Sequence, residues 1–237
     1  MAVKVIRYLW NNLTGFLIWL TWRVLFQVTV IGKKNLKLIR QQQRNILVIA
    51  NHQTLIDSWL GVFFCWPWGL FYPSLIPWHA PAKENYFGSL LLRTACYLWQ
   101  CVPVTREKNE QHQLLRQLSQ HLKKGTLMIF PEGGRHLGDQ REMRTWKSGA
   151  AYLAKQNQAM VLPIAFQGMR QVLPPRKFSP RFYWLPRFFK KITIVIGRPL
   201  APEILSNLDK EQIAQKMRAA LQEALDQASD IYFKNPS

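Results

Sequence analysis

Short apolar runs rich in β-branched residues alternate along this chain with longer helical patterns, and this alternation constrains the fold more than any other feature. The runs that predict strands lie at 45–50, 101–105, 126–130, 160–166 and 192–196. The patterns that predict helices lie at 55–64, 110–123, 145–156 and 209–232. Strands separated by helices of this size predict an α/β fold, with a central mixed, mostly parallel sheet flanked by helices.

The N-terminal region has a pattern of its own. The stretch 13–31 approaches the length of a bilayer span, but it contains Arg23 and Gln27, so it does not predict a clean transmembrane helix. We expect a helix at 3–22 that lies on or shallowly in a membrane and leads into a strand at 27–31. The alternative is a helix packed on the core with exposed tryptophans. The chain is therefore divided into a membrane-associated segment at 1–31 and one domain at 32–237.

The charge balance indicates an anionic partner. The chain has 32 Lys and Arg against 13 Asp and Glu, a formal net charge of +19, and its first acidic residue is Asp57. With 48% apolar residues it is not a disordered basic tail. Because the basic residues are interleaved with aromatic ones such as Trp19 and Trp22, the pattern favours anionic membrane lipid. Nucleic acid is not expected as a partner, since no helix-turn-helix, RNA-binding or zinc module is recognisable.

Three cysteines, Cys65, Cys96 and Cys101, lie in apolar surroundings without a CxxC pair or a histidine at metal-ligand spacing. We expect buried free thiols in a reducing compartment, and no disulfide, metal site or cofactor. The segment 65–81 holds four prolines and three tryptophans, which excludes a long helix or a central strand there. The sequence leaves open whether this loop packs under another loop or meets lipid.

A histidine and an aspartate follow the first predicted strand, in the run NHQTLID at 51–57. On one continuous helix, five residues would separate the two side chains by about 140°, so they could not touch. His52 must therefore precede the helix, where the Asp57 carboxylate can reach back to one ring nitrogen and leave the other to accept a proton. Such a pair is a general-base dyad. The alternative is a capping turn in which His52 only satisfies backbone groups.

A second motif, FPEGGR at 130–135, follows the predicted strand at 126–130. Its glycines let backbone N–H groups approach an anion, and Arg135 can hold a phosphate bidentately. Arg106 follows another predicted strand. Two arginines at the ends of separate strands lie where open α/β sheets place their ligands.

Taken together, these motifs resemble those of the glycerolipid acyltransferase family, of the type that acylates lysophosphatidic acid. NHQTLID is similar to the family's NHxxxxD, FPEGGR to its FPEGTR, and WKSGA at 146–150 to its FKxGA segment. VLPI at 161–164 resembles the fourth family motif, Arg106 stands where the second motif ends, and AK at 82–83 resembles the Ala-Lys element. The matches keep the family order and cover roughly 45–166.

The resemblance implies a role for each matching residue. It implies that His52 is the catalytic base that deprotonates the acceptor hydroxyl and that Asp57 orients it. It also implies a set of substrate-binding residues: Lys83, Arg106, Glu132, Gly133, Arg135 and Pro163. The first five are expected to form the cradle for the acceptor's phosphate, and the proline is expected to shape the wall near the acyl chain.

The activity implied by the resemblance is transfer of a fatty acyl group from acyl-CoA or acyl carrier protein to the free hydroxyl of a lysophospholipid. The first acceptor to expect is 1-acyl-glycerol-3-phosphate, which gives phosphatidic acid. The enzyme is expected to be membrane-associated with its active site on the cytoplasmic face, at the inner membrane if it is bacterial.

Two departures from the family pattern lie on the acceptor side. Gly134 replaces the usual Thr or Ser and removes a hydroxyl donor, and CVP at 101–103 replaces the Gly-rich opening of the second motif. Another lyso-lipid or amphiphilic acceptor therefore stays open. A non-catalytic lipid-binding relative and a hydrolase are further alternatives, but the NHxxxxD and EGxR residues are present and no GxSxG nucleophile elbow accompanies them.

Overall fold

The structure is a computed structural model, and it describes residues 2–42, 45–105, 107, 110–136, 138, 141–174 and 186–234. The strands are β1 (Gln27–Ile31), β2 (Ile46–Ala50), β3 (Trp78–His79), β4 (Thr126–Ile129), β5 (Met160–Gln167) and β6 (Lys191–Ile196). The α-helices are α1 (Ala2–Leu25), α2 (Leu36–Gln42), α3 (Val62–Cys65), α4 (Lys83–Tyr86), α5 (Leu90–Leu98), α6 (Gln111–Leu122), α7 (Gly149–Gln156), α8 (Met169–Val172), α9 (Pro202–Ser206) and α10 (Lys210–Lys234). Short 3₁₀ helices are η1 (Lys33–Asn35), η2 (Asp57–Gly61), η3 (Trp68–Leu70) and η4 (Pro73–Leu75).

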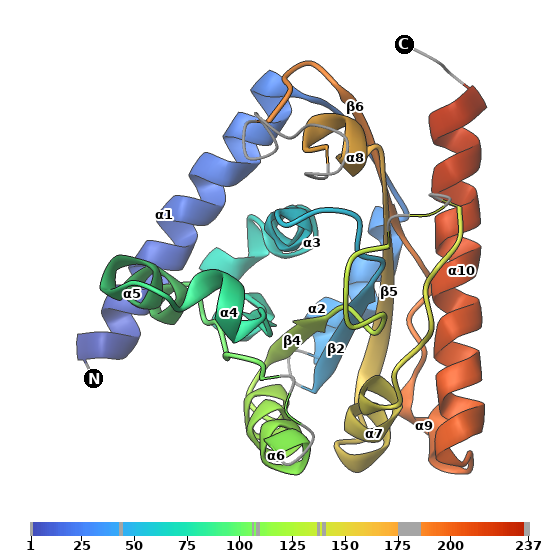
Figure 1. The fold of residues 1–237 in the computed structure, drawn as a ribbon. Coiled ribbons are helices and arrows are strands. Elements are labelled where there is room, and N and C mark those ends of the chain that lie inside the picture. Colours follow the sequence, from blue (N-terminus) through green and yellow to red (C-terminus); the bar gives the residue numbers. More distant parts are fainter. Residues whose placement is uncertain are drawn as a thin grey trace.

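The strands in the described part of the chain form one sheet in the order β1-β6-β5-β2-β4-β3. Neighbouring strands are parallel except β5 and β6, which are antiparallel. The predicted α/β fold with a mixed, mostly parallel sheet and flanking helices is therefore confirmed (Figure 1). Because β1 pairs with β6, residues 27–31 fold as part of this sheet. The division into a membrane-associated segment at 1–31 and a domain at 32–237 stays a prediction.

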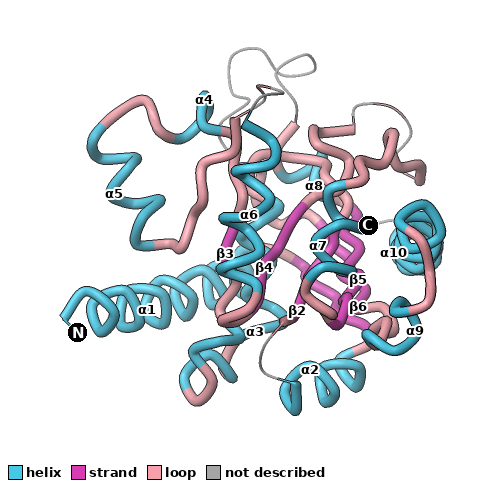
Figure 2. The backbone as a smooth tube through the Cα atoms, turned by 90° about the horizontal axis from the view of Figure 1, so that it is seen from below, coloured by secondary structure: helices cyan, strands magenta, loops and turns pink. Residues whose placement is uncertain are grey.

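Two hydrophobic cores lie on the two faces of the sheet. One lies between the sheet, α1 and α3, and the other between the sheet, α7 and α10. Figures 1 and 2 show α1 and α10 on opposite sides of the strands. Side chains alternate along β5, so that Leu162 and Ile164 enter the first core while Val161 and Ala165 enter the second. A strand covered on both faces has to be apolar throughout, which explains the uninterrupted buried run of β2.

The helix α1 runs along the outside of the first core. Near its C-terminal end Trp22 is 3% exposed and packs on Phe26, with ring centroids 4.5 Å apart. Its outer side chains face away from the protein: Leu9 is 59% exposed and Val24 is 64% exposed. Among the described residues, no helix combines the length and the apolar character that a membrane span requires. The helix expected at 3–22 is confirmed, and its contact with a membrane stays a prediction.

The segment expected to form a helix at 55–64 instead forms η2 followed by α3. The Asp57 side chain accepts hydrogen bonds from the N–H groups of Gln53 and Thr54, and such local bonds compete with a regular helix start. The helix expected at 145–156 begins only at Gly149, because the N–H of Lys147 bonds to the carbonyl of Pro131 in another loop.

The strand expected at 101–105 is also irregular. Cys101 and Val104 make isolated parallel bridges to His79 and Ala82, and Pro103 between them has no N–H to contribute to a ladder. The strand that was missed is β3, at the sheet edge inside the proline-rich segment 65–81. The same segment packs inward in one part and faces outward in another, since Leu75 is 2% exposed and Phe71 is 69% exposed.

The three cysteines are free thiols, as expected, with Cys65 and Cys96 buried and Cys101 half-buried. Burial raises the pKa of the Cys65 thiol to about 12, which leaves it protonated and unreactive at neutral pH. Within the described ranges, no group of three or more His, Cys, Asp or Glu side chains is placed to hold a metal ion.

Candidate active site

The candidate site lies at the carboxyl edge of β2 and β4. These strands are parallel, so the loops that follow them, 51–56 and 130–136, leave the sheet at the same edge. Asn51 anchors the first loop: its buried side-chain amide accepts from the N–H of Phe166 at 2.7 Å and donates to the carbonyl of Phe166 at 2.9 Å. The loop that carries His52 is thereby tied to the end of β5. Sequence reasoning assigned no separate role to Asn51, because its partner lies 115 residues away.

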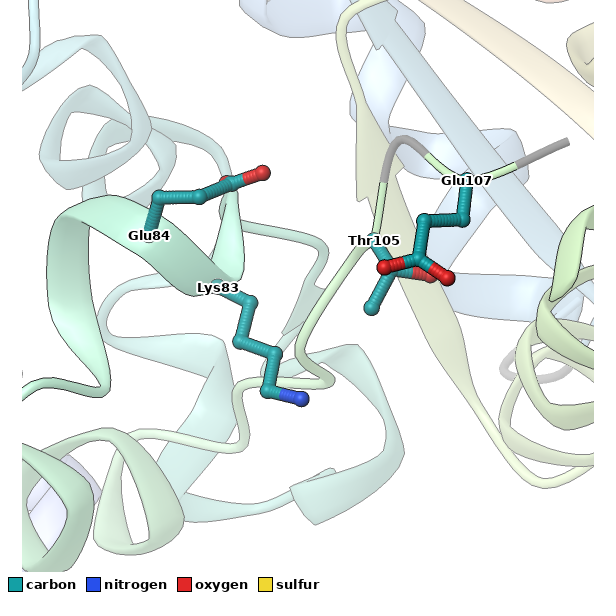
Figure 3. Close-up of a pocket in the computed structure, with 4 residues that line it drawn as sticks. All are labelled: Lys83, Glu84, Thr105 and Glu107. Atoms are coloured by element: carbon teal, nitrogen blue, oxygen red, sulfur yellow. The ribbon is translucent and has the colours of Figure 1, made fainter.

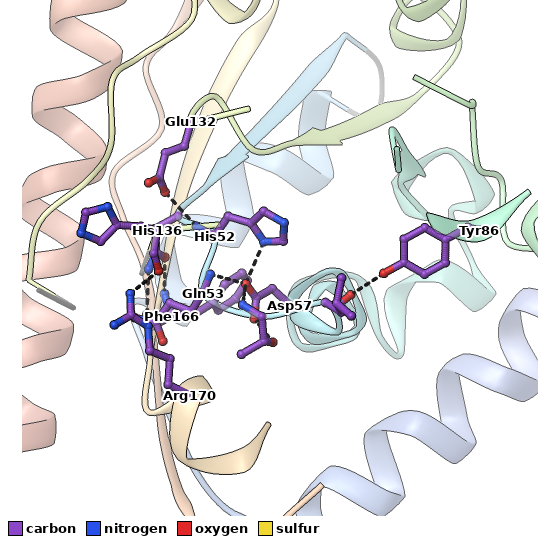
Figure 4. Close-up of polar contacts among 11 residues, drawn as sticks. His52, Gln53, Asp57, Tyr86, Glu132, His136, Phe166 and Arg170 are labelled. Atoms are coloured by element: carbon purple, nitrogen blue, oxygen red, sulfur yellow. Dashed lines mark hydrogen bonds and ion pairs between the residues drawn. The ribbon is translucent and has the colours of Figure 1, made fainter. Parts of the chain in front are cut away.

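His52 and Asp57 are in contact, as their spacing predicts (Figure 4). Nδ1 of His52 lies 3.0 Å from Oδ2 of Asp57. Since a carboxylate only accepts hydrogen bonds, Nδ1 donates and Nε2 keeps its lone pair. The His52 side chain is 18% exposed and its ring stacks on Phe130, with ring centroids 4.2 Å apart. The imidazole is thus fixed in orientation while its second nitrogen has no hydrogen-bond partner in the described part of the chain.

Asp57 is held by more than the histidine. Its Oδ2 also accepts from the N–H of Gln53 at 2.5 Å and from the N–H of Thr54 at 2.7 Å. Its Oδ1 accepts from the Thr54 hydroxyl at 2.5 Å. The side chain is 0% exposed, so these bonds replace water around a buried carboxylate. Thr54 thus donates to Asp57 through both its N–H and its hydroxyl. The motif NHxxxxD does not indicate this role, because Thr54 stands at one of its variable positions.

Glu132 holds two backbone groups. Its Oε1 accepts from the N–H of His52 at 2.9 Å and its Oε2 accepts from the N–H of Arg144 at 2.8 Å. The residue is 3% exposed. The expectation that it is part of the phosphate cradle stays a prediction, while Glu132 bonds to backbone groups through both of its oxygens. It positions the His52 backbone and joins the two motif loops.

Replacing Glu132 by alanine is expected to destabilise the protein. Two part-buried N–H groups lose their acceptor, at about 1–3 kcal/mol for each donor left unpaired and less where water reaches it. Urea unfolding measures the loss, with Glu142→Ala as the control because that exposed glutamate lies in the same region of the chain. An equal free energy of unfolding for Glu132→Ala and Glu142→Ala would contradict the idea that the hydrogen bonds of Glu132 hold the two loops together.

The turn at 133–136 closes over the dyad. Gly133 has φ 64°, a left-handed conformation that favours glycine. A Cβ atom there would lie only 2.5 Å from Cε of Lys147, so this basic side chain lies directly over the turn. The N–H of His136 donates to the carbonyl of His52 at 2.9 Å. The Arg170 guanidinium in turn donates to the carbonyl of His136, which ties the turn to α8.

The charge of Arg135, in the glycine turn, acts on Tyr86 of α4. The Tyr86 hydroxyl donates to the carbonyl of Leu55 at 3.0 Å, so α4 packs beside the 51–57 loop. Burial raises the pKa of Tyr86, the nearby Arg135 guanidinium opposes this rise, and the Asp57 carboxylate adds to it. The charges of Arg135 and Asp57 therefore both reach the same phenol. Sequence reasoning missed Tyr86, because its contact to Leu55 spans 31 residues.

Lys83 begins α4 and lines a cavity of about 340 Å³ together with Glu84, Thr105 and Glu107 (Figure 3). Two carboxylates share this cavity. Among the described residues, the Lys83 side chain has no hydrogen bond or ion pair to the dyad or to the 132–135 turn. Arg106, which is expected in the cradle, lies outside the described residues.

Pro163 is buried inside the sheet, where it is paired in register with Ile49 of β2. By the alternation along β5, its side chain is on the same face as Val161 and Ala165, which is the α10 face. A Cβ atom built on Gly197 would lie 2.8 Å from Pro163 Cγ and 3.4 Å from Cβ of Ala224 in α10. The side chain of Pro163 therefore lies on the α10 side of the sheet, and the expectation that it shapes the acyl-chain wall stays a prediction.

Fold and site together define an α/β protein that carries a His–Asp pair at the carboxyl edge of its sheet, beside a glycine turn with basic neighbours. A sequence model of the family described as Acyltransferase matches residues 27–167. The chain belongs to this acyltransferase family, and it resembles the glycerolipid acyltransferases.

Two curated relatives and one solved structure are similar to the chain. It is 26% identical over 164 residues to an N-acylphosphatidylethanolamine synthase of Arabidopsis thaliana, covering 65% of this chain and 55% of that protein. It is 24% identical over 216 residues to a 1-acyl-sn-glycerol-3-phosphate acyltransferase of Saccharomyces cerevisiae, covering 86% of this chain and 60% of that protein. The chain thus spans little more than half the length of these relatives.

The crystal structure of a 1-acyl-sn-glycerophosphate acyltransferase from Thermotoga maritima superposes with a TM-score of 0.65 at 19% identity. The match covers 96% of this chain and 79% of the other. It establishes a shared fold.

Proposed function

We propose that the protein is an O-acyltransferase that moves a fatty acyl group from a thioester donor to the free hydroxyl of a lysophospholipid. The observation that carries this proposal is the His52–Asp57 pair, in which Asp57 fixes Nδ1 and leaves Nε2 to take a proton. Because the chain belongs to the acyltransferase family, we infer that this base serves acyl transfer.

The reaction needs no acyl-enzyme. The acceptor oxygen loses its proton to Nε2 of His52 and attacks the thioester carbonyl carbon. The carbon–sulfur bond then breaks, the ester remains on the acceptor, and the departing thiolate takes the proton from the imidazolium. Asp57 stabilises the imidazolium that forms between these steps. Holding acceptor and donor together at one site supplies much of the acceleration.

The first acceptor we propose is 1-acyl-glycerol-3-phosphate, with acyl-CoA or acyl carrier protein as donor. Basic groups around the glycine turn, Arg135 and Lys147 among them, support a phosphate-bearing acceptor. Similarity to the yeast 1-acyl-sn-glycerol-3-phosphate acyltransferase supports the same choice. The similarity to the plant N-acylphosphatidylethanolamine synthase makes an amine-bearing phospholipid the second acceptor to test.

A panel assay tests the proposal. Purified protein in lipid is given labelled acyl-CoA or labelled acyl carrier protein together with lysophosphatidic acid, other lysophospholipids or phosphatidylethanolamine. We expect the fastest transfer to lysophosphatidic acid. Faster transfer to phosphatidylethanolamine would reverse the order of the two acceptors, and no transfer from either donor to any acceptor would refute the proposed activity.

We also propose that the protein works on a membrane surface, on the cytoplasmic face, through α1 and α5. The two helices are joined at their contact by the Asn11 amide, which donates to the carbonyl of Leu98 at 2.7 Å. Both helices carry exposed apolar side chains, and Leu90 and Leu91 of α5 are each 80% exposed. Basic side chains of α1, such as Arg23, suit anionic lipid.

Replacing Leu90 and Leu91 by serine is expected to weaken binding to vesicles of phosphatidylglycerol and phosphatidylcholine by roughly tenfold or more, because two leucines no longer leave water on binding. Co-sedimentation with the vesicles measures the change. Ile204→Ser in α9 is the control, since that residue is 46% exposed but lies beyond the opposite face of the sheet. Unchanged vesicle binding of the double variant would exclude α5 from the membrane contact.

A further inference from the structure

We propose that Arg144 belongs to an anion subsite for the acceptor headgroup, in the space that Gly134 leaves open. The ligand class is a phosphate monoester on a lyso-lipid, so the proposal rests on the proposed function. It makes Arg144 a specificity-determining residue at the point where this chain departs from FPEGTR.

The space beside Gly134 is taken up by the Arg144 side chain. A Cβ atom on Gly134 would lie 2.9 Å from Nη1 of Arg144, so the guanidinium occupies the place next to the backbone that a Thr or Ser would fill. Unlike Gly133, Gly134 is not in the left-handed region. Its backbone therefore does not require glycine, and a side chain at this position would have to displace the Arg144 guanidinium.

The position of Arg144 is fixed relative to the dyad. Its N–H donates to Glu132 Oε2 at 2.8 Å, and the other oxygen of the same carboxylate accepts from the N–H of His52 at 2.9 Å. One buried carboxylate therefore positions both the arginine backbone and the histidine backbone. The guanidinium itself is exposed and has no ion pair or hydrogen bond to any residue in the described ranges.

The surroundings of the guanidinium are cationic. Lys147 lies over Gly133, and Arg135 follows Gly134 directly in the chain. Glu142, two positions before Arg144, is exposed and makes no ion pair with any described residue. Glu132, the carboxylate of the turn, is turned to the backbone and buried. Three cations without a carboxylate partner among the described residues attract an anion, and a guanidinium can give a phosphate two parallel hydrogen bonds.

The test compares binding of two soluble probes by isothermal titration calorimetry with the full chain. One probe is a short-chain 1-acyl-glycerol-3-phosphate below its micelle concentration, and the other is the monoacylglycerol of the same chain length, which lacks phosphate. The variants are Arg144→Gln, Arg144→Lys, Gly134→Thr and the double variant Gly134→Thr/Arg144→Gln. Arg218→Gln, which removes an exposed arginine of α10, is the matched control.

We expect Arg144→Gln to weaken binding of the phosphate probe about tenfold or more, since the charge and the paired hydrogen bonds of the guanidinium are lost. Binding of the monoacylglycerol should be unchanged, and Arg144→Lys should lose less than Arg144→Gln. Gly134→Thr should also weaken binding of the phosphate probe, because the threonine displaces the guanidinium. Adding Arg144→Gln to this variant should lower the affinity little further.

Equal affinity of Arg144→Gln and Arg218→Gln for the phosphate probe would overturn the subsite, and so would an equal loss for both probes. If the losses of affinity caused by Gly134→Thr and Arg144→Gln add up fully in the double variant, Gly134 does not act through Arg144 and the proposed coupling is overturned. Failure of the proposed function is distinguishable from these outcomes. In that case the phosphate probe binds with the expected dependence on Arg144 while the panel assay shows no acyl transfer.

Discussion

His52→Ala is expected to lower kcat for acyl transfer by roughly 10²- to 10⁴-fold, the usual contribution of a positioned general base. The KM values for donor and acceptor should change little, because His52 acts on the proton of the acceptor hydroxyl. The fold should persist, since Asp57 keeps its bonds to Gln53 and Thr54. Initial rates and circular dichroism of the purified variant measure both effects.

His112→Ala is the control for this substitution, because that histidine is exposed on α6, away from the 51–57 loop. It should retain the kcat of the intact protein. If His52→Ala is as active as His112→Ala with every acceptor that the intact protein uses, His52 is not the base.

Asp57→Asn is expected to lower kcat by roughly 10²-fold or more with little loss of stability. An asparagine oxygen can still accept from the His52 ring and the two N–H groups, and its amide can donate to the Thr54 hydroxyl. What is lost is the negative charge beside the imidazolium that forms during the reaction. Steady-state kinetics should therefore show a change in kcat rather than in KM.

The double variant His52→Ala/Asp57→Asn sharpens this test. If the two residues act as one unit, the double variant is no slower than His52→Ala alone. Asp230→Asn serves as the control, since the Asp230 side chain is 67% exposed on α10. Independent, multiplying losses from the two substitutions would mean that Asp57 does not act through His52.

Most strands and the dyad could be predicted because their signals are local. The β-branched run of β2 and the spacing from His52 to Asp57 each need only a few neighbouring residues, and both predictions are confirmed as geometry. The segment 101–105 forms isolated bridges instead of a regular strand, and this also has a local cause, because Pro103 interrupts the ladder. The catalytic role of the pair stays a prediction until it is measured.

Three placements that sequence reasoning did not anticipate depend on long-range contacts. Glu132 resembles a ligand-facing residue of its motif, yet its oxygens bond to the backbone of residues 80 positions before it and 12 positions after it. The side on which Pro163 lies follows from the register of β5 against its neighbours. The contact of Arg144 with Gly134 depends on how the 141–148 segment folds back over the turn. No pattern of neighbouring residues specifies these three placements.

The central claim is that His52 and Asp57 activate an acceptor hydroxyl for direct acyl transfer. The most direct measurement follows the label of [¹⁴C]acyl-CoA with purified protein in vesicles, with and without lysophosphatidic acid. We expect the label to move into phosphatidic acid only when the acceptor is present, with neither free fatty acid nor labelled protein accumulating. Release of labelled fatty acid without acceptor, or label retained covalently on the protein, would contradict direct transfer.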